Sequence, residues 1–356
     1  MIKLTIFNRC LKYNAMKAWI INKVNDLTKE NFPLKLVDIP DPKPEKGELL
    51  VKVNACGVCH TEIDEIEGRT PPPSYPIIPG HQVIGIVKEV NNIKSNIKIG
   101  DRVGIAWIYS ACGKCKFCLS GNENLCAEFL ATGRDKNGGY AEYITVPEKY
   151  AYNIPNIFSD TEAAPLLCAG AIGYRSVALC NMENGKRIGL TGFGASGHLV
   201  LKLVKYKYPN SEIYVFARSK KERIFALQLG ANWAGDTTDI PPKLLDCIID
   251  TTPVWKPIFY AMECLKPGGR LVINAIRKEN IDQDYLLKLD YPKHLWMEKE
   301  IKSVANVASS DVKEFIKIAA KMPFKPEVEN YPFKKANEAL MDIKNRKIKG
   351  AKVLMI

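Results

Sequence analysis

The stretch Lys186-Arg-Ile-Gly-Leu-Thr-Gly-Phe-Gly-Ala-Ser-Gly197 decides the fold of this chain. Its first six residues predict a short buried strand, and Ser196–Tyr206 carries a helical pattern. Gly192, Gly194 and Gly197 therefore form a G-x-G-x-x-G loop between a strand and a helix. Glycines at these positions let a pyrophosphate group approach the backbone at the N-terminus of the helix. The stretch predicts a dinucleotide-binding unit.

Strand and helix patterns continue to alternate after this loop. Repeated units of this length are typical of a parallel, doubly wound Rossmann sheet, and we expect that domain to span residues 166–305. The predicted strands are Glu212–Ala217, Leu245–Asp250 and Arg270–Ala275, and the predicted helices are Lys220–Leu229 and Lys256–Leu265.

The preceding part of the chain has a different pattern, in which short β segments are separated by Pro and Gly. This punctuation predicts a β-rich domain, barrel-like or sandwich-like, over residues 1–165. Its predicted strands are Glu48–Asn54, Val83–Val90, Asp101–Ala106 and Tyr140–Val146. We expect residues 306–356 to return to this first domain, with helices at Ser310–Lys321 and Phe333–Asn345 and a strand at Ala351–Ile356. The fold class is therefore α/β, a Rossmann domain plus a β-rich domain.

Composition limits the classes of protein to which the chain can belong. Its 356 residues, of which 46% are hydrophobic and 25% charged, are ordinary for two globular domains. No apolar run is long enough to span a membrane, and Met1–Tyr13 lacks the uninterrupted apolar core of a secretory signal. The net charge of +12 is spread along the chain without a sustained basic run, so we expect no nucleic-acid partner.

Of the 11 cysteines, six lie between Cys56 and Cys126. Without a secretory signal we expect a cytoplasmic protein, in whose reducing compartment dense cysteines favour metal over disulfides. Cys112, Cys115 and Cys118 are separated by two-residue gaps, and Cys126 follows after a gap of seven. Four thiolates without an open position describe a structural zinc site. The alternative, a bacterial iron–sulfur motif, would continue with three residues and then Cys-Pro.

Three further segments carry potential metal ligands: Ala55–Glu62, Pro79–Gly85 and Pro165–Gly170. Each segment is ambiguous alone. In this order, with the four cysteines between the second and third, they resemble the zinc-containing medium-chain alcohol dehydrogenases. The resemblance is closest to bacterial and archaeal enzymes of broad substrate range, and it runs from about Lys17 to the C-terminus. It implies that the β-rich domain is a GroES-like, partly closed barrel.

The resemblance makes Cys59, His81 and Cys168 the ligands of a second, catalytic zinc. Two thiolates and one imidazole leave a fourth position open, at which zinc would polarise the alcohol while hydride passes to a nicotinamide. Thr61 corresponds to the hydroxyl that takes the substrate proton, although its alternative role is a helix cap. Glu62 corresponds to the carboxylate that hydrogen-bonds to the metal-binding His, here His81, and orients its ring.

Other positions follow from the same resemblance. His60 corresponds to a residue that contacts the cofactor pyrophosphate, and Trp107 and Ile172 correspond to the substrate pocket. An alternative for Trp107 is a core residue at a strand end. Four positions depart from the family pattern: Gln82, Asp64, Asn91, where a Gly is usual, and Ala351, where an Arg that binds the pyrophosphate is usual. Gln82 replaces the Glu that normally follows the ligand His, and Asp64 replaces the His that ends the proton relay in many relatives.

The end of the second Rossmann strand selects the cofactor. An acidic residue there binds the ribose 2′-hydroxyl of NAD, whereas Arg accommodates the 2′-phosphate of NADP. Here Ala217 occupies the acidic position, and Arg218, Ser219 and Lys220 follow it. These side chains suit a phosphate by charge and hydrogen bonding, although Arg218 has the alternative of being an ordinary surface cation. We therefore favour NADP(H) over NAD(H).

The predicted function is a zinc-dependent dehydrogenase with two zinc ions per chain that interconverts small alcohols and aldehydes or ketones. A polyol, sugar or threonine dehydrogenase is an alternative within the same fold, and it would need polar groups in the pocket. A non-catalytic zinc-binding adaptor is an alternative of another class, but it would need no open zinc site. The family implies a homodimer or homotetramer.

Overall fold

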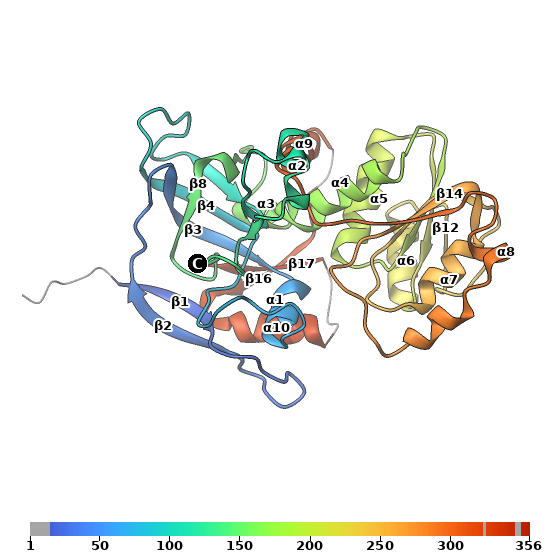
Figure 1. Cartoon of the computed structure of the whole chain (residues 1–356), viewed down its shortest axis with the longest axis horizontal. Helices are drawn as coiled ribbons and strands as arrows, with labels where there is room; N and C mark the ends of the chain where they lie inside the picture. The colour runs from blue at the N-terminus through green and yellow to red at the C-terminus, as the bar shows by residue number, and fades with distance from the viewer. Residues whose placement is uncertain (1–14, 323–324, 346–349) are drawn as a thin grey trace, which may run out of the picture.

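The computed structural model describes residues 15–322, 325–345 and 350–356, which form two lobes (Figure 1). The expectations for Met1–Tyr13 lie outside these residues. Each lobe is built on one large sheet, seven-stranded in the first lobe and six-stranded in the second. None of the helices in the described ranges is long and apolar enough to cross a membrane.

The sheet of the first lobe is formed by distant parts of the chain. Its strand order is β16-β17-β3-β4-β5-β9, and β8 also pairs with β3. Strand β3 alternates buried Leu49, Val51 and Val53 with more exposed residues, the pattern of a strand with one face on a core. The strands are β3 (Glu48–Val58), β4 (Val83–Val90), β5 (Arg102–Ile105), β8 (Tyr143–Pro147), β9 (Ala151–Asn153), β16 (Val328–Pro332) and β17 (Ala351–Met355).

Strand β17 pairs antiparallel with β3, so the final described segment of the chain lies in the first lobe. A separate hairpin, β1 (Ala15–Ile21) with β2 (Leu34–Pro40), covers this lobe. The indole of Trp19 on β1 donates a hydrogen bond to the carbonyl oxygen of Phe333 at 2.9 Å. This contact ties the hairpin to the turn that precedes α10 (Ala336–Lys344).

The second lobe is a parallel sheet in the order β12-β11-β10-β13-β14-β15. Its strand order reverses between β10 and β13, and ligands of doubly wound sheets bind at that point, outside the carboxyl ends of the strands. The predicted α/β fold class is confirmed. The strands are β10 (Arg187–Thr191), β11 (Glu212–Phe216), β12 (Trp233–Gly235), β13 (Leu245–Asp250), β14 (Leu265–Ile273) and β15 (Glu300–Ser303). The main helices of this part are α4 (Ala169–Leu179), α5 (Ala195–Lys207), α6 (Lys220–Gln228) and α7 (Lys256–Glu263).

The predicted bounds differ from the structure where strand and helix meet. The prediction that Lys256–Leu265 is helical is wrong at its end, because Leu265 pairs with Leu245 as the first residue of β14. The predicted helix from Phe333 begins later, because Phe333–Lys335 forms a 3-10 turn. The helix predicted to begin at Ser310 is α9 (Ser309–Ala319).

Helices α4 and α9 pack into a hydrophobic core to which both lobes contribute side chains. One cluster of buried side chains includes Ile84 of the first lobe, Ile188 of the second and Phe315 of α9. A Cβ atom at Gly170 of α4 would lie 2.1 Å from the ring of Phe315, which is fully buried. Only glycine therefore permits α9 to approach α4 this closely.

The substitution Gly170→Ala tests this contact. Alanine favours a helix interior by about 1 kcal/mol over glycine, but the clash with Phe315 should outweigh this gain. We expect the free energy of unfolding to fall by about 1–3 kcal/mol in a denaturant titration. Ser310→Ala, at an exposed position of α9, is the control and should change it by less than about 0.5 kcal/mol. A more stable Gly170→Ala variant would show that the packing is looser than described.

Candidate active site and metal clusters

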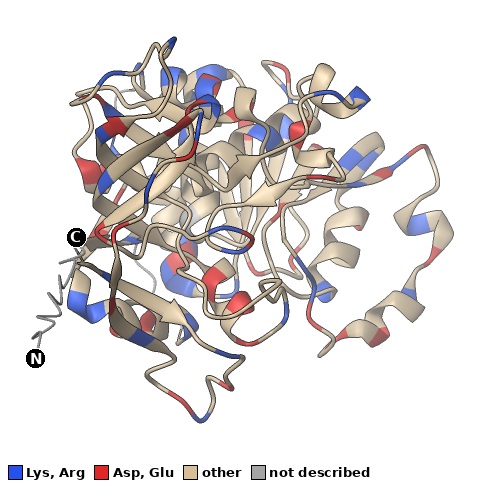
Figure 2. Ribbon diagram, turned by 60° about the vertical axis from the view of Figure 1, so that its left-hand side comes forward, with Lys and Arg blue, Asp and Glu red and all other residues tan. Residues whose placement is uncertain are grey.

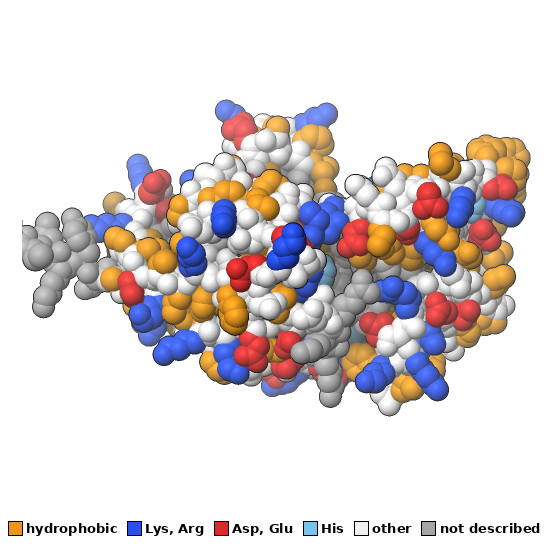
Figure 3. Space-filling view, turned by 90° about the horizontal axis from the view of Figure 1, so that it is seen from below, with side chains coloured by type: hydrophobic (Ala, Val, Ile, Leu, Met, Phe, Trp, Pro, Cys, Tyr) orange, Lys and Arg blue, Asp and Glu red, His pale blue; other side chains and the backbone are white. Residues whose placement is uncertain are grey.

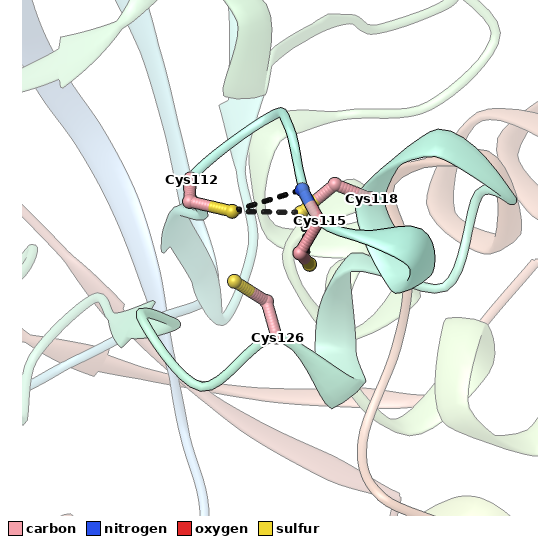
Figure 4. Close-up of side chains that lie close together, drawn as sticks. All are labelled: Cys112, Cys115, Cys118 and Cys126. Atoms are coloured by element: carbon pink, nitrogen blue, oxygen red, sulfur yellow. Dashed lines mark hydrogen bonds between the residues drawn. The ribbon is translucent and has the colours of Figure 1, made fainter.

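Four cysteines converge on one loop of the first lobe (Figure 4). The Sγ atoms of Cys112, Cys115, Cys118 and Cys126 all lie within 4.8 Å of one another. Cys115 is the N-cap of α2 (Lys116–Leu119), and Cys126 follows a 3-10 turn at Glu123–Leu125. Two separate turns therefore deliver the four sulfurs to one point.

Backbone N–H groups around this cluster favour thiolates. The amide of Cys115 donates to Sγ of Cys112 at 3.4 Å, and the amide of Glu128 donates to Sγ of Cys126 at 3.3 Å. Hydrogen bonds from the backbone at Lys114 and Cys115 lower the pKa of Cys112 to about 6. Four sulfur donors with no polar oxygen among them fit a closed, tetrahedral zinc site.

The second cluster joins three segments. Ligand atoms of Cys59, His81 and Cys168 lie within 4.8 Å of one another, and Nε2 of His81 is 3.3 Å from Sγ of Cys168. Cys59 is the N-cap of α1 (His60–Ile66), His81 precedes β4, and Cys168 is the N-cap of α4. Three donors of this kind fit a zinc site with one position left open.

Glu62 connects two members of this second cluster. One carboxylate oxygen lies 2.8 Å from Nδ1 of His81, and the other accepts a hydrogen bond from the backbone N–H of Cys59 at 2.8 Å. Burial opposes a charge on His81, but the Glu62 carboxylate raises the pKa of this imidazole above its usual value. A carboxylate at Nδ1 leaves Nε2 directed to the cluster.

Thr61 is the second residue of α1 and does not cap it. The N-cap is Cys59, whose free N–H is satisfied by Glu62, so the alternative prediction of a Thr61 cap is wrong. The hydroxyl of Thr61 lies 3.4 Å from Sγ of Cys59. Its position beside the cluster leaves a proton-accepting role open. His60, the first residue of the same helix, is exposed.

Apolar and amide side chains surround the second cluster. The ring of Trp107 stands edge-on to His81 with centroids 4.9 Å apart, and Trp107 is 4% exposed. Ile172 is half-buried on α4, where its N–H donates to the carbonyl of Cys168 at 2.9 Å. Gln82 fills the space over Gly57, where a Cβ atom would lie 2.5 Å from its Oε1. The glycine of β3 therefore makes room for the amide.

Glu65 is a buried carboxylate that the sequence-based prediction missed. It lies one turn after Glu62 on α1, is 1% exposed, and has no hydrogen-bond partner for either oxygen among the described residues. Burial, and then the charge of Glu62, raise its pKa well above the usual range. The three-residue spacing from Glu62 was the available signal, because it puts both side chains on one helix face.

Two glycines of the dinucleotide loop lie so close to neighbouring atoms that a side chain would not fit. Gly192 has φ +83°, and a Cβ atom there would lie 2.6 Å from Oγ1 of Thr251. A Cβ atom at Gly197 would lie 2.8 Å from the carbonyl oxygen of Gly192. Gly194 is the N-cap of α5, so the loop opens directly onto a helix N-terminus. This is the arrangement that binds a pyrophosphate.

Arg218 and Ser219 lie between β11 and α6, Lys220 is the first residue of α6, and all three are exposed. The backbone of this turn is held by Arg223, which the sequence-based prediction missed. Its guanidinium donates to the carbonyls of Ala217 at 2.7 Å and Arg218 at 3.0 Å. Lysine and arginine elsewhere alternate with acidic residues over both lobes (Figure 2).

The chain is similar to known proteins over almost its whole length. The profile of the alcohol dehydrogenase GroES-like domain matches residues 45–156. The protein of Mycobacterium tuberculosis named "Probable alcohol dehydrogenase AdhA" is 40% identical over 347 residues, which cover 96% of this chain and 98% of that protein. An alcohol dehydrogenase of Geobacillus stearothermophilus is 33% identical over 350 residues, with 96% and 99% covered.

This chain belongs to the zinc-containing medium-chain alcohol dehydrogenases. It is an oxidoreductase of that family.

Solved structures share the fold at lower identity. A Helicobacter pylori CAD has a TM-score of 0.83 at 23% identity, with 96% and 98% covered. A thermostable alcohol dehydrogenase of Pyrobaculum aerophilum has a TM-score of 0.82 at 22% identity, with 96% and 100% covered. The adaptor alternative does not fit an enzyme family matched over almost the whole chain.

Proposed function

We propose that this alcohol dehydrogenase interconverts small alcohols with aldehydes or ketones, uses NADP(H), and binds two zinc ions per chain. The observation that carries the proposal is the partly buried set Cys59, His81 and Cys168, which offers three ligands and one open position. The solved Pyrobaculum aerophilum relative is described as cobalt- and zinc-bound, which supports the same metal class here.

Each residue near the open position has a separate task in this proposal. Cys59, His81 and Cys168 would hold a zinc ion, which when bound supplies a Lewis acid for the substrate oxygen. Thr61, 3.4 Å from Sγ of Cys59, accepts the alcohol proton while it releases its own hydroxyl proton towards solvent. Glu62 holds the imidazole of His81 in the tautomer that ligates metal. Gln82, which is buried beside this cluster, leaves the zinc without the usual neighbouring carboxylate.

The substrate is an alcohol with an apolar body, because the pocket candidates Trp107 and Ile172 are apolar. A polyol, sugar or threonine substrate would need hydrogen-bonding side chains in their place. The cluster of Cys112, Cys115, Cys118 and Cys126 would hold the structural zinc.

Metal analysis of purified variants tests the two-site assignment. We expect about two zinc ions per wild-type chain and about one in both Cys126→Ser and Cys168→Ser. Cys126→Ser should also lower the Tm, because a structural zinc contributes folding energy. Cys168→Ser should keep its fold and lose activity. Cys264→Ser, at a free thiol outside both clusters, is the control and should retain two ions. A single zinc in the wild-type chain would contradict the proposal.

NADP(H) is favoured by the turn after β11. Ala217 carries no carboxylate to repel a 2′-phosphate, and the exposed side chains of Arg218, Ser219 and Lys220 follow it. The guanidinium of Arg223 binds the carbonyl oxygens of Ala217 and Arg218. These hydrogen bonds restrain the backbone from which the side chain of Arg218 extends. The Helicobacter pylori relative of the same fold is described as complexed with NADP(H).

The substitution Arg218→Ala tests this preference in a panel of alcohols and aldehydes assayed with NADPH and with NADH. Loss of a charge-assisted hydrogen bond should raise the KM for NADPH about 10-fold, while the KM for NADH stays unchanged. Lys313→Ala removes an exposed charge of α9 and should change neither value. Equal effects on both cofactors, or a wild-type preference for NADH, would refute the assignment.

We also propose that the enzyme is a homodimer or homotetramer that associates through β15. All four residues of this edge strand are exposed, and an open strand edge invites pairing. Large apolar side chains are exposed on it and just before it in the chain, namely Ile301 (45%) and Trp296 (55%). Such patches mark interaction surfaces. None of the ten cysteines among the described residues forms a disulfide with another of them, which is consistent with the expected cytoplasmic location.

Sedimentation measurements test the association. The wild-type enzyme should sediment as a dimer or tetramer, and Ile301→Lys should shift it toward a monomer, because the charge would enter the buried edge. Ile93→Lys, at a fully exposed position of the first lobe, should leave the assembly unchanged. A monomeric wild-type enzyme would exclude the proposed interface.

A further inference from the structure

Arg277 joins the two lobes through a charge pair. It follows β14 in the second lobe, and its Nε donates to Oδ1 of Asp64 on α1 of the first lobe at 3.0 Å. The side chain of Asp64 is 4% exposed and that of Arg277 is 19% exposed. An ion pair with this little exposure is screened much less than one on the open surface.

The neighbouring Lys278 anchors this segment to the cofactor edge of the second lobe. Its ammonium donates to Asp250, the last residue of β13, and to the carbonyl oxygen of Thr252 at 2.7 Å. The carboxylate of Asp250 is fully buried. Asp250 stands at the carboxyl end of the strand beside the dinucleotide loop. The two adjacent cations therefore connect the cofactor edge, through Lys278, with α1, through Arg277.

The other end of the connection leads to the second metal cluster. Asp64 lies on the same short helix as Thr61, and Cys59 is the N-cap of that helix. Arg69 of the same lobe also donates to Oδ1 of Asp64, through Nε at 2.7 Å. Because Arg69 keeps Asp64 paired within the first lobe, loss of Arg277 does not leave a buried charge alone.

A cavity of about 470 Å³ lies at this junction and is lined by Arg69, Arg277, Lys278, Glu279, Asn280 and Ile281. The space-filling view shows the groove that separates the two lobes on one face (Figure 3). The contact from Arg277 to Asp64 therefore crosses from one lobe to the other beside this cavity.

We propose that the Asp64–Arg277 pair is an inter-lobe latch, and that Arg277 is a positioning residue for hydride transfer. The inference rests on the proposed roles of Cys59 and of the dinucleotide loop, which put the substrate on one lobe and the nicotinamide on the other. Reacting atoms must approach to about 3–3.5 Å, and a misplacement of about 1 Å can cost 100-fold in rate. The latch sets the separation between α1 and the carboxyl end of β13.

The closing experiment compares wild type, Arg277→Gln and Arg69→Gln as full-length, zinc-loaded enzymes. In Arg277→Gln the single-turnover rate of hydride transfer should fall about 10- to 100-fold. The isotope effect on kcat with a deuterated alcohol should rise, while zinc content stays equal to wild type. Arg277→Lys, which keeps a cation, should recover part of the rate. Arg69→Gln breaks the pair within the first lobe and should lower the Tm without changing the isotope effect.

Small-angle X-ray scattering supplies a readout that needs no turnover. Without cofactor, the radius of gyration of Arg277→Gln should exceed that of wild type, because the lobes are no longer latched. An unchanged radius and an unchanged hydride-transfer rate would each overturn the inference, as would a loss of Tm alone. A wild-type enzyme that oxidises no alcohol would refute the proposed function instead, and the scattering comparison would still decide whether the latch exists.

Discussion

One buried carboxylate, that of Glu62, constrains much of the first lobe. A charged carboxylate with no exposed surface is stabilised when its oxygens find partners, whereas an unpaired buried charge costs several kcal/mol and, as at Glu65, burial favours the protonated acid. The partners of Glu62 are the imidazole of His81 and the backbone N–H of Cys59. Because Glu62 makes both contacts, the start of α1 is fixed against the segment before β4. The same geometry brings two of the three potential ligand atoms together, so the stability of the buried acid and the proposed chemistry of the site have one structural cause.

The local parts of this arrangement could be predicted from the sequence. Strands β4 and β13 have the predicted bounds, because their apolar runs end at turn residues. The two cysteine-rich sets could also be predicted, since metal ligands follow short spacings or a recognised order of motifs. The end of the predicted helix at Leu265 was wrong, because Leu265 pairs with Leu245 and tertiary pairing overrides a helical pattern.

Arg277 was missed because its partner is remote in the chain. Arg277 and Asp64 are 213 positions apart, and no local periodicity reports such a pair. Arg223 is nearer to the turn that it holds, but a basic residue in the first turns of a helix gives no sign of the carbonyls to which it donates. Glu65 differs, because its position three residues after Glu62 could have drawn attention to a doubly acidic, buried helix face.

The pairing of β17 with β3 gives the second lobe the topology of an inserted domain. The chain leaves the first lobe through α4 and returns through α9, and these two helices pack against each other where Gly170 meets Phe315. Two adjacent crossings restrain relative motion more than a single linker does. They permit rotation about an axis through the helix pair and resist independent tumbling. Any opening of the groove between the lobes must therefore be accommodated at these two helices, and it would have to break the Asp64–Arg277 contact.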